Sequence, residues 1–370
     1  MNKKIKKGCG CLFGAVLLLL VTGAVTLYVL KPKWHDDYGQ RFTDIAYGSR
    51  EHNTYDLYLP VDAASKDSLA LILYVHGGSW LGGDKYEHHG DCYKWVQKGY
   101  ATATMNYSLL NEGGVSLLTM LEEIDACIRH IEQFAAGKGV HIRQMAIGGT
   151  SAGGHLAMMY AYSHSHPLPI RFAAIKVGPA DFRILFPYNG DAKTEEVENF
   201  VFSCTGERLD GSALTRERLD SIKLMASPVF YINDSTALPS IFAYGEKDWL
   251  VKPDHYHALQ AMYDSLGKPY DLIVFPNSGH TLMNDKDCNE KYDSTMSAYC
   301  KKYFDTHSSE PSTCAVETQR TQRTQRNNDE KSVYQEMPRH FPDRLRDENN
   351  GVSPLCRGFT TNGTRHRLLL

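Results

Sequence analysis

The sequence predicts an α/β fold in which a mostly parallel central sheet is flanked by helices. Short, almost wholly apolar runs such as residues 69–75 are typical of strands that are covered on both faces of a parallel sheet. Stretches with apolar residues at helical spacing, such as 117–134, lie between these runs. Chemically reactive residues follow several of the apolar runs directly, at the strand ends where α/β folds build their sites.

The elements expected around this sheet follow one another along the chain. Residues 45–60 alternate apolar and polar side chains, which is typical of antiparallel edge strands. Apolar runs predict further strands at 69–75, 100–105, 145–147, 172–177, 239–244 and 271–275. Periodic or small-residue stretches predict helices at 117–134 and 152–162.

The most informative motif is Gly149-Thr150-Ser151-Ala152-Gly153, between the strand at 145–147 and the helix at 152–162. A serine on a strand-to-helix turn, with a glycine two residues away on each side, is typical of a nucleophile elbow. Only glycine fits at the flanks of so tight a turn, which lifts the Ser151 hydroxyl clear of the sheet. The backbone N–H of Ala152 then lies at the start of a helix, where the dipole favours a developing oxyanion.

A second motif, His76-Gly77-Gly78-Ser79-Trp80, directly follows the strand at 69–75. A His-Gly-Gly turn at a strand exit is typical of an oxyanion loop, because glycine lets the backbone approach a carbonyl and turn its N–H groups inward. We expect Gly77 or Gly78 to supply an oxyanion donor besides Ala152. We expect His76 to order the loop by hydrogen bonds rather than to act as an acid or base.

Two further residues complete a candidate catalytic triad. Asp248 follows the strand at 239–244, with Glu246 and Asp254 as less favourable competitors for the same role. His280 lies on the loop after the strand at 271–275, from which it can reach the nucleophile. Along the chain these residues occur in the order Ser151, Asp248, His280. Serine-triad enzymes of unrelated folds have other orders, and this one is typical of a serine on a strand-to-helix turn of an α/β sheet. His280 is expected to take the Ser151 proton, and Asp248 to hold the imidazole tautomer.

With these motifs the chain resembles the α/β-hydrolase superfamily, in its HGG-motif esterase and lipase branch. Within that branch it is most similar to the bifunctional feruloyl and acetyl-xylan esterase-like proteins. The resemblance covers roughly residues 42–305. The matching stretches are 55–60, 76–80, 148–157, 244–251 and 274–280. One departure is Asn106-Tyr107-Ser108, where relatives often carry Asp-Tyr-Arg. Because of it, the resemblance does not predict the wall of the pocket, whereas the triad is unaffected.

The resemblance implies a serine hydrolase that cleaves carboxylic esters, of short-chain, acetyl or feruloyl type, without a cofactor or metal. The substrate is expected to be a small-molecule or carbohydrate-linked ester. An amidase or arylformamidase with the same triad is the alternative within enzymes. A catalytically inactive binding module is the alternative outside them, although such a module would be expected to have lost the serine or the histidine.

The composition excludes some partners. With 40 basic and 43 acidic residues the net charge is −3, so there is no basic footprint for nucleic acid. Nine cysteines are too few for a disulfide scaffold, and spacing alone does not decide whether Cys288 and Cys300 pair. We place the histidine pairs 88–89 and 164/166 in surface loops rather than in a metal site. The oligomeric state has no signal in the sequence.

The sequence of residues 1–33 is typical of a membrane anchor. Four lysines between Lys3 and Lys7 precede an uncharged apolar stretch that is close to the length needed to span a bilayer. The lysines favour leaving that end in the cytoplasm, so the enzyme would lie on the extracytoplasmic side as a single-pass protein. Secretion after cleavage of a signal peptide, near Thr22-Gly23-Ala24, is the alternative. A buried core helix is the least favoured interpretation.

The rest of the chain divides into a catalytic domain at 40–306 and a tail at 307–370. Within the domain, residues 182–228 lack a clear period and carry Phe186, Tyr188, Phe200 and Phe202. We interpret this interval as a small cap-like insertion that shapes the substrate pocket; a surface insertion without substrate contact is the alternative. The tail is rich in polar and charged residues and poor in large apolar ones, which predicts disorder.

Overall fold

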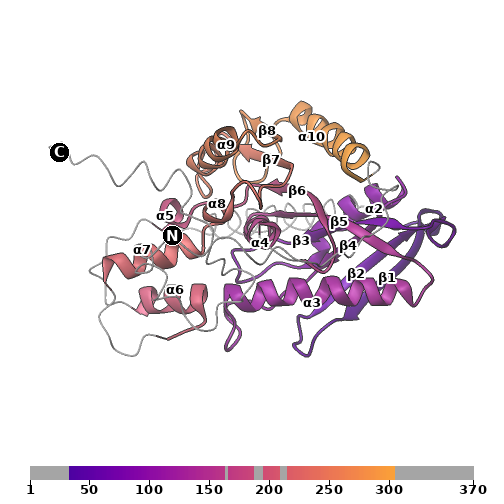
Figure 1. Ribbon diagram of the computed structural model, residues 1–370, viewed down its shortest axis with the longest axis horizontal. Helices are drawn as coiled ribbons and strands as arrows, with labels where there is room; N and C mark the ends of the chain where they lie inside the picture. The colour runs from indigo at the N-terminus through magenta and orange to yellow at the C-terminus, as the bar shows by residue number, and fades with distance from the viewer. Residues whose placement is uncertain (1–32, 163–165, 187–194, 209–214, 305–370) are drawn as a thin grey trace, which may run out of the picture.

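The computed structural model describes residues 33–162, 166–186, 195–208 and 215–304 of the chain (Figure 1). These residues form an eight-stranded sheet in the order β1-β2-β4-β3-β5-β6-β7-β8. β2 runs antiparallel to both of its neighbours, and the remaining neighbouring pairs are parallel. The mostly parallel sheet predicted from the sequence is therefore confirmed.

The strands agree with the apolar runs, although several are longer than predicted. They are β1 Gly39–Ala46, β2 Thr54–Pro60, β3 Leu69–Val75, β4 Ala101–Met105, β5 Ile142–Thr150, β6 Ile170–Lys176, β7 Ser240–Gly245 and β8 Tyr270–Phe275. β3 is buried along its whole length, which explains why it shows no alternation of apolar and polar residues.

The α-helices are α2 His89–Val96, α3 Leu117–Ala136, α4 Ala152–Ala161, α5 Phe182–Leu185, α6 Glu195–Thr205, α7 Arg216–Met225, α8 Pro228–Tyr231, α9 Asp254–Leu266 and α10 Lys286–Tyr299. A 3₁₀ turn, η3 Lys85–His88, leads into α2. α3 begins with a capping box between Ser116 and Thr119, which satisfies free backbone donors at its first turn.

Helices cover both faces of the sheet. α3, α4 and α9 contribute to one hydrophobic cluster, and α2 and α10 contribute to the cluster on the opposite face. α4 is buried on every side, so its sequence carries small and apolar residues throughout rather than an amphipathic stripe. This central helix begins immediately after Ser151, and its rigid packing fixes the position of that residue.

The interval predicted as an insertion, 182–228, is mainly helical where the structure describes it. α6 packs against α3 and α7, and both α6 and α7 lie at the end of the molecule away from β1 and β2 (Figure 1). Residues 187–194 and 209–214 of this interval lie outside the described residues.

The predicted membrane anchor at 1–33 and the predicted disordered tail at 307–370 fall almost wholly on residues outside those that the structure describes. Within the described ranges, no helix combines the length and the apolar character needed to cross a bilayer.

Candidate active site

Ser151 lies on a strained turn between β5 and α4. Its backbone has φ 54° and ψ −120°, a conformation that side-chain-bearing residues rarely adopt. A Cβ built on Gly149 would lie 2.7 Å from the Val75 carbonyl oxygen, and one built on Gly153 would lie 2.1 Å from the same atom. Both flanking positions therefore require glycine, as the sequence motif implies.

The side chains of Ser151, His280 and Asp248 form a hydrogen-bonded line. Ser151 Oγ lies 2.9 Å from His280 Nε2, and His280 Nδ1 lies 2.7 Å from Asp248 Oδ2. A carboxylate only accepts hydrogen bonds, so Nδ1 carries the ring proton and donates a hydrogen bond to Asp248. Nε2 is then free of a proton and accepts the hydrogen bond of the Ser151 hydroxyl. The Asp248 side chain is fully buried, whereas that of His280 is 23% exposed and open to a substrate.

Asp248 is the carboxylate that the structure brings to the histidine. Its other oxygen, Oδ1, accepts the backbone N–H groups of Leu250 and Val251, which fixes the orientation of the carboxylate. The competitor Glu246 instead accepts the hydroxyl of Tyr256, and Asp254 begins α9. Asp248, which the sequence favoured because of the Gly-x-x-Asp spacing, is therefore the carboxylate that bonds to His280.

Of the two candidate oxyanion glycines, Gly77 is already occupied. Its N–H donates to Glu87 Oε2 at 2.8 Å, so it is not free to bind a substrate oxygen in this structure. Among the described residues, the structure gives no acceptor for the N–H of Gly78 or for that of Ala152 at the start of α4. Gly78 and Ala152 are therefore the two candidate donors whose N–H groups have no acceptor within the described part of the chain.

The oxyanion loop is held from behind by the segment after β4. The buried ring of His76 stacks on Tyr107 with centroids 4.4 Å apart, and the Tyr107 hydroxyl donates to the His76 carbonyl. The Leu110 N–H donates to the Trp80 carbonyl. His76 itself donates from Nδ1 to the Gly77 carbonyl at 2.7 Å, which fits the structural role expected for it.

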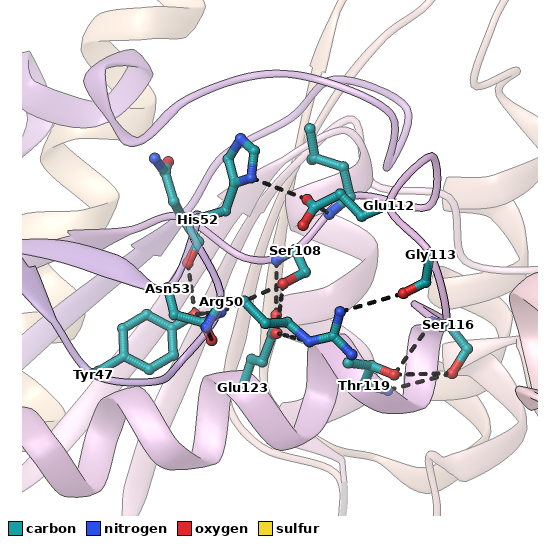
Figure 2. A network of polar contacts seen from close by, with 12 residues as sticks. Tyr47, Arg50, His52, Asn53, Ser108, Glu112, Gly113, Ser116, Thr119 and Glu123 are labelled. Atoms are coloured by element: carbon teal, nitrogen blue, oxygen red, sulfur yellow. Dashed lines mark hydrogen bonds and ion pairs between the residues drawn. The ribbon is translucent and has the colours of Figure 1, made fainter.

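Ser108, where the family resemblance predicts that arginine is common, belongs to a separate polar network (Figure 2). The buried Glu123 carboxylate accepts both the backbone N–H and the hydroxyl of Ser108, each at 2.7 Å. The guanidinium of Arg50, from the β1–β2 connection, approaches the same carboxylate at 3.8 Å (Figure 2). This departure from the family pattern anchors the loop that carries Tyr107, and it does not enter the triad.

An aromatic cluster joins the oxyanion loop and the nucleophile helix to the insertion. Phe182 of α5 contacts Trp80 and His155, with ring centroids 5.6 Å and 4.7 Å away, and Phe186 contacts Phe200 of α6 at 4.8 Å. His155 lies one turn after Ser151, and its backbone N–H donates to the Ser151 carbonyl. Burial lowers the pKa of the His155 imidazole to about 4. Of the other aromatic residues predicted here, Tyr188 lies outside the described residues.

The surface-loop prediction is wrong for His88. This ring is 3% exposed, stacks on Tyr74 and bonds Asp91 through Nδ1 at 3.0 Å. His89 reaches the fully buried Asp56 at 2.8 Å. Both residues therefore pack between η3, α2 and the sheet, and no periodic pattern in the sequence marks this stretch as buried.

Cys288 and Cys300 are both free thiols, so they do not pair with one another. In the part of the chain that the structure describes, His, Cys, Asp and Glu side chains nowhere gather in a group of three or more that could hold a metal ion.

Comparison with known proteins identifies the family. The family model described as BD-FAE matches residues 55–263, which is more than half of the chain. Kynurenine formamidase of Danio rerio is 32% identical over 121 residues, covering 32% of this chain and 38% of that protein. The kynurenine formamidase of Salmo salar is 27% identical over 121 residues, covering 32% of this chain and 38% of that protein. This chain thus spans well under half the length of the curated relatives that it matches.

Solved structures share the fold at low sequence identity. A truncated carbohydrate esterase from gut microbiota has a TM-score of 0.58 at 19% identity, covering 73% of this chain and 100% of that one. Esterase B from Lactobacillus Rhamnosis has a TM-score of 0.57 at 19% identity, covering 80% and 96%. The fold is therefore that of the α/β-hydrolases. With its family model spanning β2 to α9, this chain belongs to the BD-FAE family, an esterase family of the α/β-hydrolase fold.

Proposed function

We propose that this protein is a serine esterase that hydrolyses short-chain, acetyl or feruloyl-type carboxylic esters through an acyl-enzyme. The observation that carries the proposal is the hydrogen-bonded line from Ser151 Oγ through His280 to Asp248. A nucleophile, a base and a group that orients the base are the parts that acyl transfer needs.

In the first half of the proposed reaction, Ser151 Oγ attacks the ester carbonyl while His280 Nε2 takes its proton. Asp248 stabilises the imidazolium that forms and holds the ring in place. The N–H groups of Gly78 and Ala152 bind the oxyanion, and His280 then gives its proton to the departing alcohol. In the second half, water activated by His280 attacks the acyl-enzyme and releases the acid.

The substrate class is also a proposal. The aromatic cluster around Phe182 supports a role of the insertion in lining the pocket, since its rings reach the helix of the nucleophile. A structural relative described as a carbohydrate esterase, and another described as a bifunctional GH43-CE protein, support an ester carried on a carbohydrate. A small-molecule ester remains part of the same proposal.

An arylformamidase is the second candidate, and the identity of 32% to a kynurenine formamidase favours it. Both activities use the same triad, so only substrates separate them. The test is a panel of p-nitrophenyl acetate, a methyl ferulate, acetylated xylan and an N-formyl arylamine. We expect the esters to have the higher kcat/KM. A preference for the formyl amide would replace the esterase proposal with the arylformamidase.

A fluorophosphonate probe tests whether the site is chemically competent at all. We expect covalent labelling that a Ser151→Ala variant loses, because the probe reacts only with an activated serine. Labelling of neither protein would favour a binding module instead.

We also propose that residues 1–33 anchor the enzyme in a membrane, with the catalytic domain on the extracytoplasmic side. The lysine cluster and the apolar stretch after it support this. Expression of the full chain in a bacterium should leave it in the membrane pellet after an alkaline carbonate wash. A soluble product whose N-terminus begins near residue 25 would support cleavage of a signal peptide instead.

A further inference from the structure

Glu87 places a carboxylate on the backbone of the oxyanion loop. Its Oε2 accepts the N–H of Gly77 at 2.8 Å, ten residues earlier in the chain. Gly77 is buried, so without this partner its N–H would be a buried donor with no acceptor, which costs about 1–3 kcal/mol. A hydrogen bond to a charged acceptor is roughly twice as strong as a neutral one. Glu87 itself is exposed to solvent, so its hold on the Gly77 peptide rests on this one 2.8 Å hydrogen bond.

The bond lies beside the nucleophile. A Cβ built on Gly77 would lie 3.4 Å from the Ser151 Cβ and 3.5 Å from Glu87 Oε2. Glu87 is therefore hydrogen-bonded to the part of the loop that lies next to Ser151.

The backbone carbonyl groups of the oxyanion loop also have hydrogen-bond partners. The Gly77 carbonyl accepts from His76, and the Gly78 carbonyl accepts the N–H groups of Leu81 and Gly82. Gly78 has φ 109°, a conformation that suits glycine and turns the next peptide sharply. The N–H of Gly78 is left without an acceptor among the described residues, on the residue next to the peptide that Glu87 holds.

The turn that carries Glu87 is itself rigidly tied. The Asp84 side chain accepts the N–H of Tyr86, and the Lys85 N–H donates to Asn106 at 2.6 Å. The buried Lys85 ammonium pairs with Asp44 at 2.6 Å. A group held on such a support can position another group with little loss of conformational entropy.

Lys176 is a positively charged residue whose backbone contacts the nucleophile. Lys176 ends β6, and its carbonyl accepts the N–H of Ser151. Burial lowers the pKa of the Lys176 ammonium, but Asp91 first, then Tyr292 and further acidic groups that include Glu87, raise it well above its ordinary value. The Lys176 ammonium pairs with Asp91 at 3.8 Å, and Glu87 contributes a smaller favourable interaction with it.

We propose that Glu87 is a positioning residue of the oxyanion loop, which fixes the Gly77 amide so that the Gly78 amide is the one offered to the substrate oxygen. This inference rests on the proposed serine-hydrolase function of the same site. Glu87 acts through the backbone and not on the reacting atoms.

The kinetic test uses Glu87→Ala, Glu87→Gln and the control Glu51→Ala. Glu51 is an exposed glutamate on the β1–β2 connection. With p-nitrophenyl acetate we expect Glu87→Ala to lower kcat about tenfold to a hundredfold with KM nearly unchanged, because preorganised donors act mainly on the transition state. Glu87→Gln should recover most of kcat, since its amide oxygen can accept the same N–H. The control should match the wild type.

A kcat for Glu87→Ala equal to that of the wild type would overturn the proposal. So would an equally large loss in Glu87→Gln, because that result would assign the effect to charge rather than to the hydrogen bond.

A spectroscopic readout separates this proposal from the esterase proposal. In ¹H–¹⁵N spectra the Gly77 amide proton should resonate downfield in the wild type, and move upfield in Glu87→Ala but not in Glu51→Ala. This holds whether or not the protein hydrolyses an ester. A Gly77 signal that is unchanged in Glu87→Ala would overturn the inference and leave the proposed activity untouched, whereas an inactive wild type with the expected shift would affect only the proposed activity.

Discussion

Ser151 combines a strained backbone with a reactive hydroxyl on a half-buried residue. A non-glycine residue at φ 54° costs about 1–3 kcal/mol, which the packing of β5 and α4 must offset. The fully buried α4 and the two flanking glycines provide this support. The strain has a use, because it aims the hydroxyl at His280 instead of into the helix.

His155 makes the stability of the protein depend on pH. Its pKa is lowered to about 4 by burial, whereas an unfolded histidine titrates near 6.5. Between these values the unfolded chain binds the extra proton, so the free energy of unfolding falls as pH drops from about 6.5 to about 4, by up to ~1.4 kcal/mol per pH unit. Urea unfolding at several pH values measures this slope.

The variant His155→Gln should show a shallower loss of stability in the same pH window, because it removes one such group. The matched control is His257→Gln, at an exposed histidine of α9, which should keep the slope of the wild type. Equal slopes in all three proteins would rule out this role for His155.

At the scale of elements, the elbow depends on the close approach of α4 to the end of β3. Gly153→Ala would place a methyl group 2.1 Å from the Val75 carbonyl oxygen and 2.3 Å from that of His76. We expect a loss of about 1–3 kcal/mol in unfolding free energy, together with a loss of esterase activity, although alanine favours helix.

Gly113→Ala is the control for this prediction, because an added Cβ there meets no atom within 4 Å. It should change stability by less than about 0.5 kcal/mol. Thermal or urea unfolding of both variants measures the contrast, and a Gly153→Ala protein as stable and active as Gly113→Ala would contradict the tight packing of the elbow.

The network in Figure 2 joins the β1–β2 connection, the loop after β4 and helix α3. Glu123→Ala leaves the buried N–H of Ser108 without its acceptor, so we expect a loss of about 1.5–3 kcal/mol in unfolding free energy. Arg50→Ala should cost no more than about 1 kcal/mol, because this pair is 3.8 Å apart and the arginine side chain is 39% exposed. Urea denaturation ranks the two variants, and the reverse order would show that the ion pair is the stronger contact.

The elements that the sequence made predictable are those whose geometry allows few residue types. The elbow could be predicted because Gly149 and Gly153 leave no room for a Cβ. The oxyanion donor could not be chosen between Gly77 and Gly78, since both fit a glycine loop. The observation that bears on this choice is the bond from the Gly77 N–H to Glu87 of η3, a contact between residues ten apart that no local pattern predicts. The burial of His88 was missed for the same reason, because an isolated 3₁₀ turn has no readable period.

At the scale of the whole molecule, the parallel sheet is what makes a site from distant residues. Ser151 and His280 are 129 residues apart in sequence and His280 and Asp248 are 32 apart, yet all three follow the carboxyl ends of β5, β7 and β8. Parallel strands present these ends at one edge, so the fold and the candidate site are two aspects of one arrangement. The shape of the insertion at 182–228 could not be predicted, because its sequence has no clear period.

The most direct test of this account is the rate of p-nitrophenyl acetate hydrolysis by the purified wild type and by Ser151→Ala. We expect the variant to keep its fold, as seen by circular dichroism, and to lose kcat/KM by at least about a thousandfold, because the nucleophile is gone. A folded Ser151→Ala protein that hydrolyses the ester at the wild-type rate would contradict the account.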